Sequence, residues 1–449
     1  MNKRPCDSDI LDELMKNPQN GCVIIPPRKS EVEPERTYWL IDRAVLIPEN
    51  TTVILQNCTI KLSDSCRDNF FRSANCGIGI TDVKTIRNLH IRGEGYSLLL
   101  GADHPRSTGD SSKILACPCP KKPEDIVRFA DWIPEERRSL DKLLFWDAHD
   151  HSYGTDAAKD GEHHGGDWRN IGILFACVEN FSIENLHMKD YHGWAVSLED
   201  CAFGEVRGMD FDACMAREID GMTQNSENQD GIDLRNGCHD ITIRDIRGGT
   251  GDDIVALTAI CNESAPFRQS GELSSTHILH NDWSKRCRDI YNVVIQNMVG
   301  YSKGGVCYLV RLLATQCKIY NVIINGIIDT SPENRRADGV LTIGDRGYGE
   351  VARESIVHVS ISDIICNSRR AVVVDGYLKD SVINGIVNRN PDAPILALGS
   401  EDSLDGVTVG AVAGTSKMPV VLYGWENGQL VNRKAPESIK KHNRFSFDF

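Results

Sequence analysis

A short β-strand pattern that recurs along the chain is the feature that most constrains its fold. Each copy has alternating apolar positions and then a turn residue, and the copies lie at residues 180–186, 239–246, 291–298 and 320–327. Further strands of the same size lie between them, as at residues 194–198 and 306–310. Several short strands per roughly 20 to 30 residues, without helical patterning between them, are typical of a β-helix rather than a sandwich or a βαβ sheet. We therefore expect an all-β parallel solenoid of about 10 coils.

The same pattern extends toward both ends of the chain. It is present early, at residues 45–55 and 89–92, and late, at residues 371–374, 395–398 and 420–422. Because a solenoid grows in one dimension, length alone does not divide it into domains. We therefore expect a single β-helix domain over residues 1–449.

Two segments depart from the repeat. Residues 101–168 are first Pro-rich, then carry apolar positions at three- and four-residue spacing, and end in a stretch rich in Gly, Asp and His. We expect a partly helical insertion there that projects over one face and closes one end of a cleft, since long insertions are often functional. Residues 433–449 are basic and then aromatic, and we expect them to cap the last coil, whose strand edges would otherwise be exposed.

Charge and composition narrow the classes of partner. The formal net charge of −14 argues against binding nucleic acid, which requires a basic surface. Residues 1–9 lack the apolar core of a signal peptide, and no run approaches 18 apolar residues. The 16 cysteines are scattered singly and are interpreted mostly as reduced core thiols. We therefore expect a cytoplasmic protein without a membrane partner.

Two acidic clusters give the strongest indication of function. The run Asn-Gln-Asp-Gly-Ile-Asp occupies residues 228–233, and Gly-Asp-Asp occupies residues 251–253. Asp230 and Asp252 are 22 residues apart, about one period of the repeat. If one repeat is one coil, the clusters lie on neighbouring coils at about the 4.8 Å strand spacing. Asp230, Asp252 and Asp253 would then share one patch, where mutual repulsion raises at least one pKa, as an acid/base pair requires.

The structural explanation of these aspartates must be weighed beside the catalytic one. Asp and Asn are common at solenoid turns because their side chains bond nearby backbone groups. A single such motif would therefore mean little. Two clusters one period apart, one of them with a doubled aspartate, favour the catalytic interpretation, which requires neither a cofactor nor a metal ion.

The run from Asn170 to Leu257 resembles glycoside hydrolase family 28, the polygalacturonase family, whose members are right-handed parallel β-helices. The family's Asn-Thr-Asp-Gly-Ile-Asp motif is similar to residues 228–233, and its Gly-Asp-Asp motif is similar to residues 251–253. Both motifs match in order and spacing. The resemblance covers residues 170–330 by motif and the rest of the chain by architecture. It implies a glycosidase that acts on pectin-type or related oligosaccharides, and we expect exo action.

Two family motifs are altered in this sequence. The His-Gly motif corresponds to a region that contains His277 and His280, neither of them followed by glycine. The Arg-x-Lys motif corresponds to Arg311 and Leu313, so the lysine is absent. In the family this basic pair is associated with binding the carboxylate of a uronic acid. The resemblance therefore supports glycosidase chemistry more strongly than it supports galacturonate as the sugar.

The candidate substrate-binding residues surround these motifs. Alternation along the strand places Asp233 on the face of the presumed cleft, as a ligand for sugar hydroxyls or as a solvated carboxylate. Arg311 could bind a carboxylate or hydroxyl pair, or could form an ion pair with a protein acid. The full candidate set for substrate binding is Asp233, Asn228, His277, His280, Arg311 and His192.

The resemblance also implies a mechanism, single displacement with inversion. Asp252 would be the general acid, and Asp230 and Asp253 would activate water. An inverting pair needs room for that water, with carboxyl groups about 6.5 to 9.5 Å apart. The residues by themselves support the group of three aspartates and leave their roles open, because coupled carboxylates titrate as a set.

Other functions on the same scaffold remain open at this point. One is a polysaccharide lyase or an intramolecular fructosyltransferase; a lyase would require a basic proton acceptor and often uses calcium. Another is a β-helix that binds carbohydrate without catalysis. Fold alone does not choose among them. The sequence is also compatible with association of such stacks into a homo-oligomer.

Overall fold

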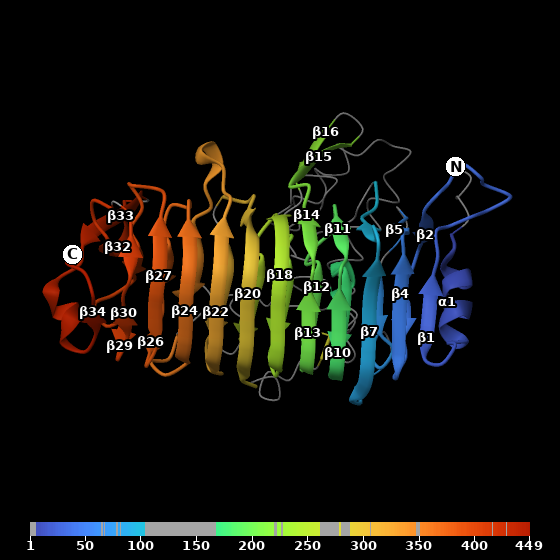
Figure 1. Ribbon diagram of the computed structural model, residues 1–449, viewed down its shortest axis with the longest axis horizontal. Coiled ribbons are helices and arrows are strands. Elements are labelled where there is room, and N and C mark those ends of the chain that lie inside the picture. The colour runs from blue at the N-terminus through green and yellow to red at the C-terminus, as the bar shows by residue number, and fades with distance from the viewer. Residues whose placement is uncertain are drawn as a thin grey trace, which may run out of the picture. The chain divides into compact units, whose positions relative to one another are not determined.

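A computed structural model gives the fold of the chain (Figure 1). It describes residues 6–63, 66, 68–77, 80, 82–103, 168–219, 222–225, 228–260, 278–279, 288–305, 307–346, 351–414, 416–427 and 429–449. Most of the expected insertion at 101–168 lies outside the described residues. Within those ranges, no helix has the length and apolar character that crossing a bilayer would require.

The chain divides into two compact units. The first contains residues 1–232 and 267–282, and the second contains residues 233–266 and 283–449. Each unit is built from parallel strands that pair coil to coil. The single domain expected over residues 1–449 stays a prediction.

The first unit has three rows of parallel strands. One row is β1 (Cys22–Ile25), β4 (Thr51–Gln56), β7 (Ile86–Glu94), β10 (Val178–Glu184) and β13 (Ala202–Arg207). The second is β2 (Trp39–Ile41), β5 (Thr59–Leu62), β8 (Leu98–Leu100), β11 (His187–Lys189) and β14 (Asp210–Asp212). The third is β3 (Val45–Ile47), β6 (Phe71–Ser73), β9 (Ile173–Ala176) and β12 (Val196–Glu199).

The first unit also contains elements outside these rows. Helix α1 (Ser8–Lys16) buries Leu11 and Met15, and a 3-10 turn, η1, spans Trp168–Asn170. Strands β15 (Ala216–Ile219) and β16 (Met222–Asn225) form an antiparallel hairpin. The sequence pattern predicted neither α1 nor the hairpin.

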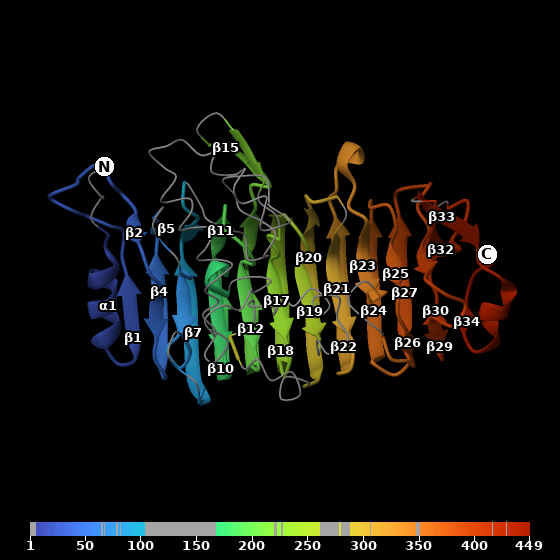
Figure 2. The same cartoon turned by 180° about the vertical axis from the view of Figure 1, so that it is seen from behind.

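The second unit has two principal rows of strands, which Figures 1 and 2 show. One row begins with β18 (His239–Thr250), β20 (Ile290–Ser302), β22 (Ile319–Asp329) and β24 (Ile356–Cys366), and continues with β26 (Leu378–Lys379) and β27 (Val382–Asn388). It ends with β29 (Leu404–Asp405), β30 (Thr408–Val409), β31 (Val412–Ala413) and β34 (Arg444–Phe445).

The other row of the second unit positions the candidate site. It is β17 (Ile232–Arg235), β19 (Val255–Ala259), β21 (Tyr308–Ala314), β23 (Gly339–Ile343), β25 (Val372–Val374), β28 (Leu396–Leu398) and β32 (Val420–Glu426), with β33 (Gln429–Lys434) antiparallel to β32. Two 3-10 turns, η3 (Glu333–Arg335) and η5 (Glu437–Lys441), lie outside the rows.

The core of the second unit consists of apolar columns that run from coil to coil. Register pairs Ile243 with Ile295, Ile324, Ile361 and Ile383 on successive strands, and all five are at most 1% exposed. Because the side-chain period of a strand is two, the intervening residues point outward, which explains the alternation seen in the sequence.

Two corners recur in each coil of the second unit. At each corner one residue has positive φ, a conformation that Asn, Asp and Gly adopt more easily than other residues. The two corners are five residues apart in five successive coils, at 240 and 245, 292 and 297, 321 and 326, 358 and 363, and 380 and 385. Amide side chains connect neighbouring coils there: Asn292 donates to Asp240 at 3.0 Å, and Asn321 donates to Asn292 at 3.0 Å.

The cysteines in the described ranges are free thiols, and most are buried. Burial raises the pKa of Cys58 to about 12 and that of Cys76 to about 11. Such thiols are mostly protonated near neutral pH and act as small apolar side chains, which agrees with the sequence interpretation.

Candidate active site

The candidate site lies on consecutive strands of the second unit. Asp252 and Asp253 occupy the connection between β18 and β19, directly before the apolar residues of β19. Asp233 is the second residue of β17, which neighbours β19, and Arg311 is the fourth residue of β21, which pairs with β19. The parallel register thus brings side chains that are far apart in sequence onto adjacent coils.

Asp253 is held by two donors from β21. The backbone N–H of Tyr308 donates to Oδ1 of Asp253 at 2.8 Å, and Nε of Arg311 donates to Oδ2. The same guanidinium donates through Nη1 to Asp345 at 2.8 Å and lies over the Tyr308 ring. Asp253 is 2% exposed. Arg311 therefore joins two carboxylates and fixes the orientation of the buried one.

Burial dominates the protonation of the two most enclosed carboxyl groups. It raises the pKa of Asp253 to about 6, against the lowering effect of the Arg311 charge and with a further rise from Asp252. Burial also raises the pKa of Asp233 well above its usual range, with Arg235 opposing this rise and Asp253 adding to it. Both shifts have the physical cause expected for carboxyl groups in an acid/base site.

Asp233 is enclosed rather than solvated. It is 1% exposed, and its Oδ2 has no hydrogen-bond partner within the described residues. The solvated carboxylate that the sequence left open at this position is therefore wrong. A buried carboxyl oxygen without a partner is costly unless the group is protonated or meets a ligand.

Asp252 completes this acidic group within the second unit. It is partly buried, and an oxygen of its carboxyl group lies within 4.8 Å of an oxygen of Asp253. One water molecule that donates a hydrogen bond to each of two carboxylates holds their oxygens about 4 to 5 Å apart, given ordinary bond lengths. The pair can therefore position a single water molecule, although its oxygens lie closer together than the about 6.5 to 9.5 Å expected between the carboxyl groups of an inverting pair.

The contacts of Asp253 disfavour a metal ion at this position. Both of its oxygens already accept protein donors, and one donor is a permanently charged guanidinium. A second cation beside Arg311 would be repelled by the charge of the guanidinium.

The remaining predicted residues lie mostly in the first unit. Asp230 is 6% exposed, and its carbonyl oxygen accepts the Ala195 N–H at 2.9 Å. Asn228 is partly buried and has a φ of 59°. Because Asp230 belongs to the first unit, its grouping with Asp252 and Asp253 stays a prediction.

The predicted histidines are placed differently. His192 is 4% exposed, and its Nε2 accepts the backbone N–H of Ala102 at 3.1 Å, so the ring is engaged in packing within the first unit. His277 and His280 lie outside the described residues. A substrate-binding role for these histidines stays a prediction.

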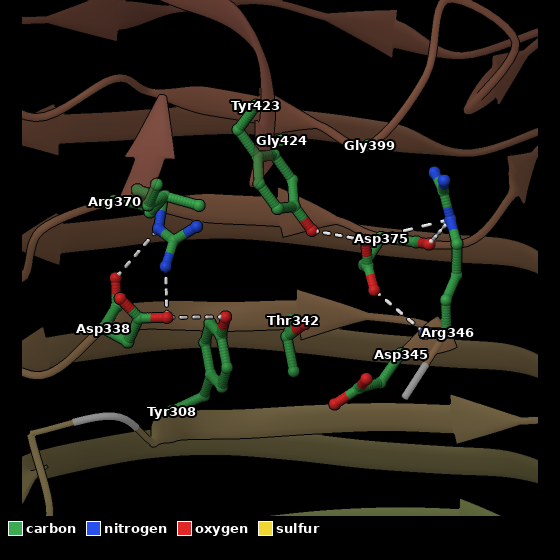
Figure 3. Close-up of a pocket in the computed structure, with 11 residues that line it drawn as sticks. Tyr308, Asp338, Thr342, Asp345, Arg346, Arg370, Asp375, Gly399, Tyr423 and Gly424 are labelled. Carbon is green, nitrogen blue, oxygen red and sulfur yellow. Dashed lines mark hydrogen bonds and ion pairs between the residues drawn. The ribbon is translucent and has the colours of Figure 1, made fainter. Parts of the chain in front are cut away.

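A pocket of about 590 Å³ opens in the second unit (Figure 3). It lies beside Arg311, because two of its lining residues, Tyr308 and Asp345, contact the Arg311 guanidinium. It shares Tyr308 and Asp345 with the acidic site and extends over the following coils. The residues in register with Arg311 on the next strands have small side chains, Thr342, then Val373, then Ala397. Of these residues Thr342 lines the pocket, and Val373 and Ala397 form a buried cluster with Tyr308.

Hydrogen-bonded side chains line the pocket, and sequence reasoning did not find them. Figure 3 shows Tyr308 and Arg370 meeting at Asp338, and Tyr423 and Arg346 meeting at Asp375. Burial raises the pKa of both tyrosines, so each hydroxyl remains a neutral donor. The sequence did contain a signal. When the apolar strands are aligned by register, one inward-facing residue from each strand forms a column that runs from coil to coil. Asp253, Tyr308 and Arg370 each lie two residues before a member of that column.

Comparison with solved structures identifies the fold. A polygalacturonase from Erwinia carotovora ssp. carotovora is 12% identical over 95% of this chain and 94% of its own, with a TM-score of 0.52. An endo-xylogalacturonan hydrolase from Aspergillus tubingensis is 11% identical over 98% and 96%, with a TM-score of 0.53. A surface adhesin of Streptococcus pneumoniae, PfbA, is 14% identical over 93% and 84%, with a TM-score of 0.48.

The likenesses to the polygalacturonase and to the endo-xylogalacturonan hydrolase confirm the expected fold class, an all-β right-handed parallel β-helix. No protein-family model matches the sequence, and no curated protein matches it. At these identities the comparison establishes the architecture, and the chemistry must be argued from the side chains.

Proposed function

We propose that this protein is a glycoside hydrolase that cleaves pectin-type or related oligosaccharides. The observation that carries the proposal is the arrangement around Asp253, a buried carboxyl group oriented by Arg311 and the Tyr308 N–H and lying beside Asp252. The pKa of Asp253 is raised to about 6. A carboxyl group in that range can accept a proton from water near neutral pH and release it again within one turnover.

The roles follow the inverting scheme implied by the sequence resemblance. Asp252, the more accessible of the pair, protonates the leaving oxygen, and Asp253 withdraws a proton from the attacking water. Asp230 of the first unit is assigned to the same water on the basis of its sequence motif. Burial raises the pKa of Asp233 well above its usual range, which favours the uncharged form of this neighbour of Asp253.

The contacts of Arg311 bear on the lyase alternative. A lyase requires a basic group able to accept the proton removed from the sugar ring. The Arg311 guanidinium is charged at all accessible pH values and is engaged by Asp253 and Asp345. Hydrolysis, which uses carboxylates and water, therefore matches the described residues better.

The first test is product analysis on a panel of uronic and neutral oligosaccharides. Mass spectrometry would follow the products, and proton NMR would follow the anomer formed at the start of the reaction. The parent protein is compared with Asp252→Asn and with a matched control, Asp402→Asn, which changes an exposed carboxylate paired with Arg353.

The hydrolase proposal predicts saturated products with inverted anomeric configuration from the parent and the Asp402→Asn control, and at least about a hundredfold less turnover from Asp252→Asn. Unsaturated products would identify a lyase, and anhydro or cyclic products would identify a transferase. Binding without turnover of any sugar in the panel would make the site a carbohydrate-binding surface. Each of these last outcomes contradicts the proposal.

A further inference from the structure

The pocket beside Arg311 has groups suited to reading sugar hydroxyls. Arg370 donates through Nη2 to Oδ2 of Asp338 and through Nε to the Asp338 carbonyl oxygen at 3.3 Å. The Tyr308 hydroxyl donates to the same Oδ2 at 3.0 Å. These contacts leave Oδ1 of Asp338 as an acceptor and Nη1 of Arg370 as a donor. A neighbouring acceptor and donor complement hydroxyl groups, each of which both donates and accepts.

A second carboxylate of the pocket is held in a similar way. Asp375 accepts the Tyr423 hydroxyl at 2.6 Å through Oδ1 and the Arg346 N–H at 2.9 Å through Oδ2. The Arg370 guanidinium lies 5.3 Å from the centre of the Tyr423 ring. The tyrosines therefore hold the polar groups in place, and both form part of the pocket lining.

The charges of the pocket lining disfavour an anionic sugar. Three aspartates, Asp338, Asp345 and Asp375, line it together with two arginines, Arg346 and Arg370. Arg370 is nearly buried and is already paired with Asp338, and Arg346 is half exposed and donates through Nε to the Asp375 carbonyl oxygen at 2.7 Å. A uronic carboxylate would add a further negative charge and could only accept hydrogen bonds, so it could not satisfy the free oxygen of Asp338.

We infer that this pocket binds a neutral sugar unit of the substrate, beside the cleavage site, and discriminates against a uronic acid there. The hydroxyls of that sugar bond to Asp338 and Arg370, and its ring packs near Tyr308 and Tyr423. The inference rests on the proposed function for the location of the reacting bond, whereas binding in the pocket can be measured without turnover.

The test measures binding of matched sugars by isothermal titration calorimetry. Tetrasaccharides from polygalacturonate and from xylogalacturonan are each used in native form and after chemical reduction of the C6 carboxyl groups to primary alcohols. The full chain carries Asp252→Asn so that bound sugar is not consumed. We expect at least one reduced tetrasaccharide to bind about tenfold or more tightly than its native form, because the like-charge contact is removed.

Two further variants test whether the pocket itself is responsible. Gly424 lines the pocket, and a Cβ atom added there meets no other atom within 4 Å, so Gly424→Tyr should fill the space without disturbing the fold. We expect this variant to lose at least about tenfold in affinity for the reduced sugar. Asp338→Asn should bring the affinities of the two forms together. Lys417→Ala, which changes a lysine whose side chain is 83% exposed, should leave binding unchanged.

Three results would overturn the inference. They are equal or tighter binding of the native uronic form, absence of binding by every reduced sugar, and unchanged binding by Gly424→Tyr with an intact circular dichroism spectrum. The hydrolase proposal fails separately. If a reduced sugar binds in the pocket and the parent shows no turnover, the pocket inference stands and the hydrolase proposal is refuted. If the protein hydrolyses a sugar that binds best in its uronic form, the hydrolase proposal stands and the pocket inference is refuted.

Discussion

The Asp253 carboxyl group should make the protein less stable at neutral pH than at acidic pH. Its pKa is about 6 in the folded protein, compared with an ordinary value near 3.8. A raised carboxyl pKa means that the folded state favours the protonated form. The contribution of this group to stability is therefore complete below pH of about 3.8, declines as pH rises through about 6, and is lost above that. The difference between the two pKa values corresponds to roughly 3 kcal/mol.

Replacing Asp253 with asparagine isolates this effect, because an amide of nearly the same shape does not titrate. The free energy of unfolding of the parent and of Asp253→Asn would be measured in urea between pH 4 and pH 8, by tryptophan fluorescence and circular dichroism. Relative to the variant, the parent should lose roughly 2 to 3 kcal/mol between pH 4 and pH 8, most of it below pH 7. Asp253 also raises the pKa of Asp233, so removing its charge acts in the same direction.

The matched control is Asp402→Asn, whose carboxylate is 69% exposed. Its pH profile should run parallel to that of the parent. If the profile of Asp253→Asn is also parallel to that of the parent, Asp253 is not a buried carboxyl group of raised pKa. Asp253 would then not be suited to accept a proton near neutral pH.

Three further changes have expected outcomes. Arg311→Lys should shift the acidic limb of the pH profile of kcat/KM to higher pH and should lower activity at least about tenfold. The reason is that one ammonium group cannot hold both aspartates that the guanidinium joins. An unchanged profile would contradict this. Asp329→Ala should lower the free energy of unfolding in urea by roughly 3 kcal/mol or more, because the fully buried carboxylate accepts three hydrogen bonds whose donors would lose their partner. As a control, Lys417→Ala should change that free energy by less than about 0.5 kcal/mol. Gly344→Ala should lower both stability and activity in parallel thermal and kinetic assays. Gly344 has a φ of +72°, an added Cβ atom would lie 2.7 Å from Gly376, and Gly344 is next to the aspartate that Arg311 binds. A variant as stable and active as the parent would refute this.

The sequence predicted the coils well because their periodicity is local. Alternating apolar residues at 291–298 and 320–327 fall within β20 and β22, and the late runs at 371–374, 395–398 and 420–422 correspond closely to β25, β28 and the start of β32. Strand β21 was predicted too early, at 306–310, and it continues to Ala314, because apolar residues on both sides of Arg311 extend the pairing with β19.

The site was predictable in part. Asp252 and Asp253 could be located from their motif, and Arg311 from its position relative to that motif. Its two aspartate partners could not be found in the same way, because Asp345 lies 34 residues beyond it and pairing depends on which strands become neighbours. The pocket was missed for the same reason. Its lining residues come from several coils, and which of them become neighbours is visible only after the strands have been aligned.

The recurring five-residue distance between the two corners of each coil has a consequence for how such a chain can change over time. Successive first corners are separated by 52, 29, 37 and 22 residues, from Asp240 through Asn292, Asn321 and His358 to Asp380, although the corner distance stays the same. Insertions and deletions are thus confined to the rest of the coil. The connecting loops can diverge or be exchanged between β-helices of this kind while the strands remain aligned, so a designer who keeps each corner pair intact can vary the loops one coil at a time.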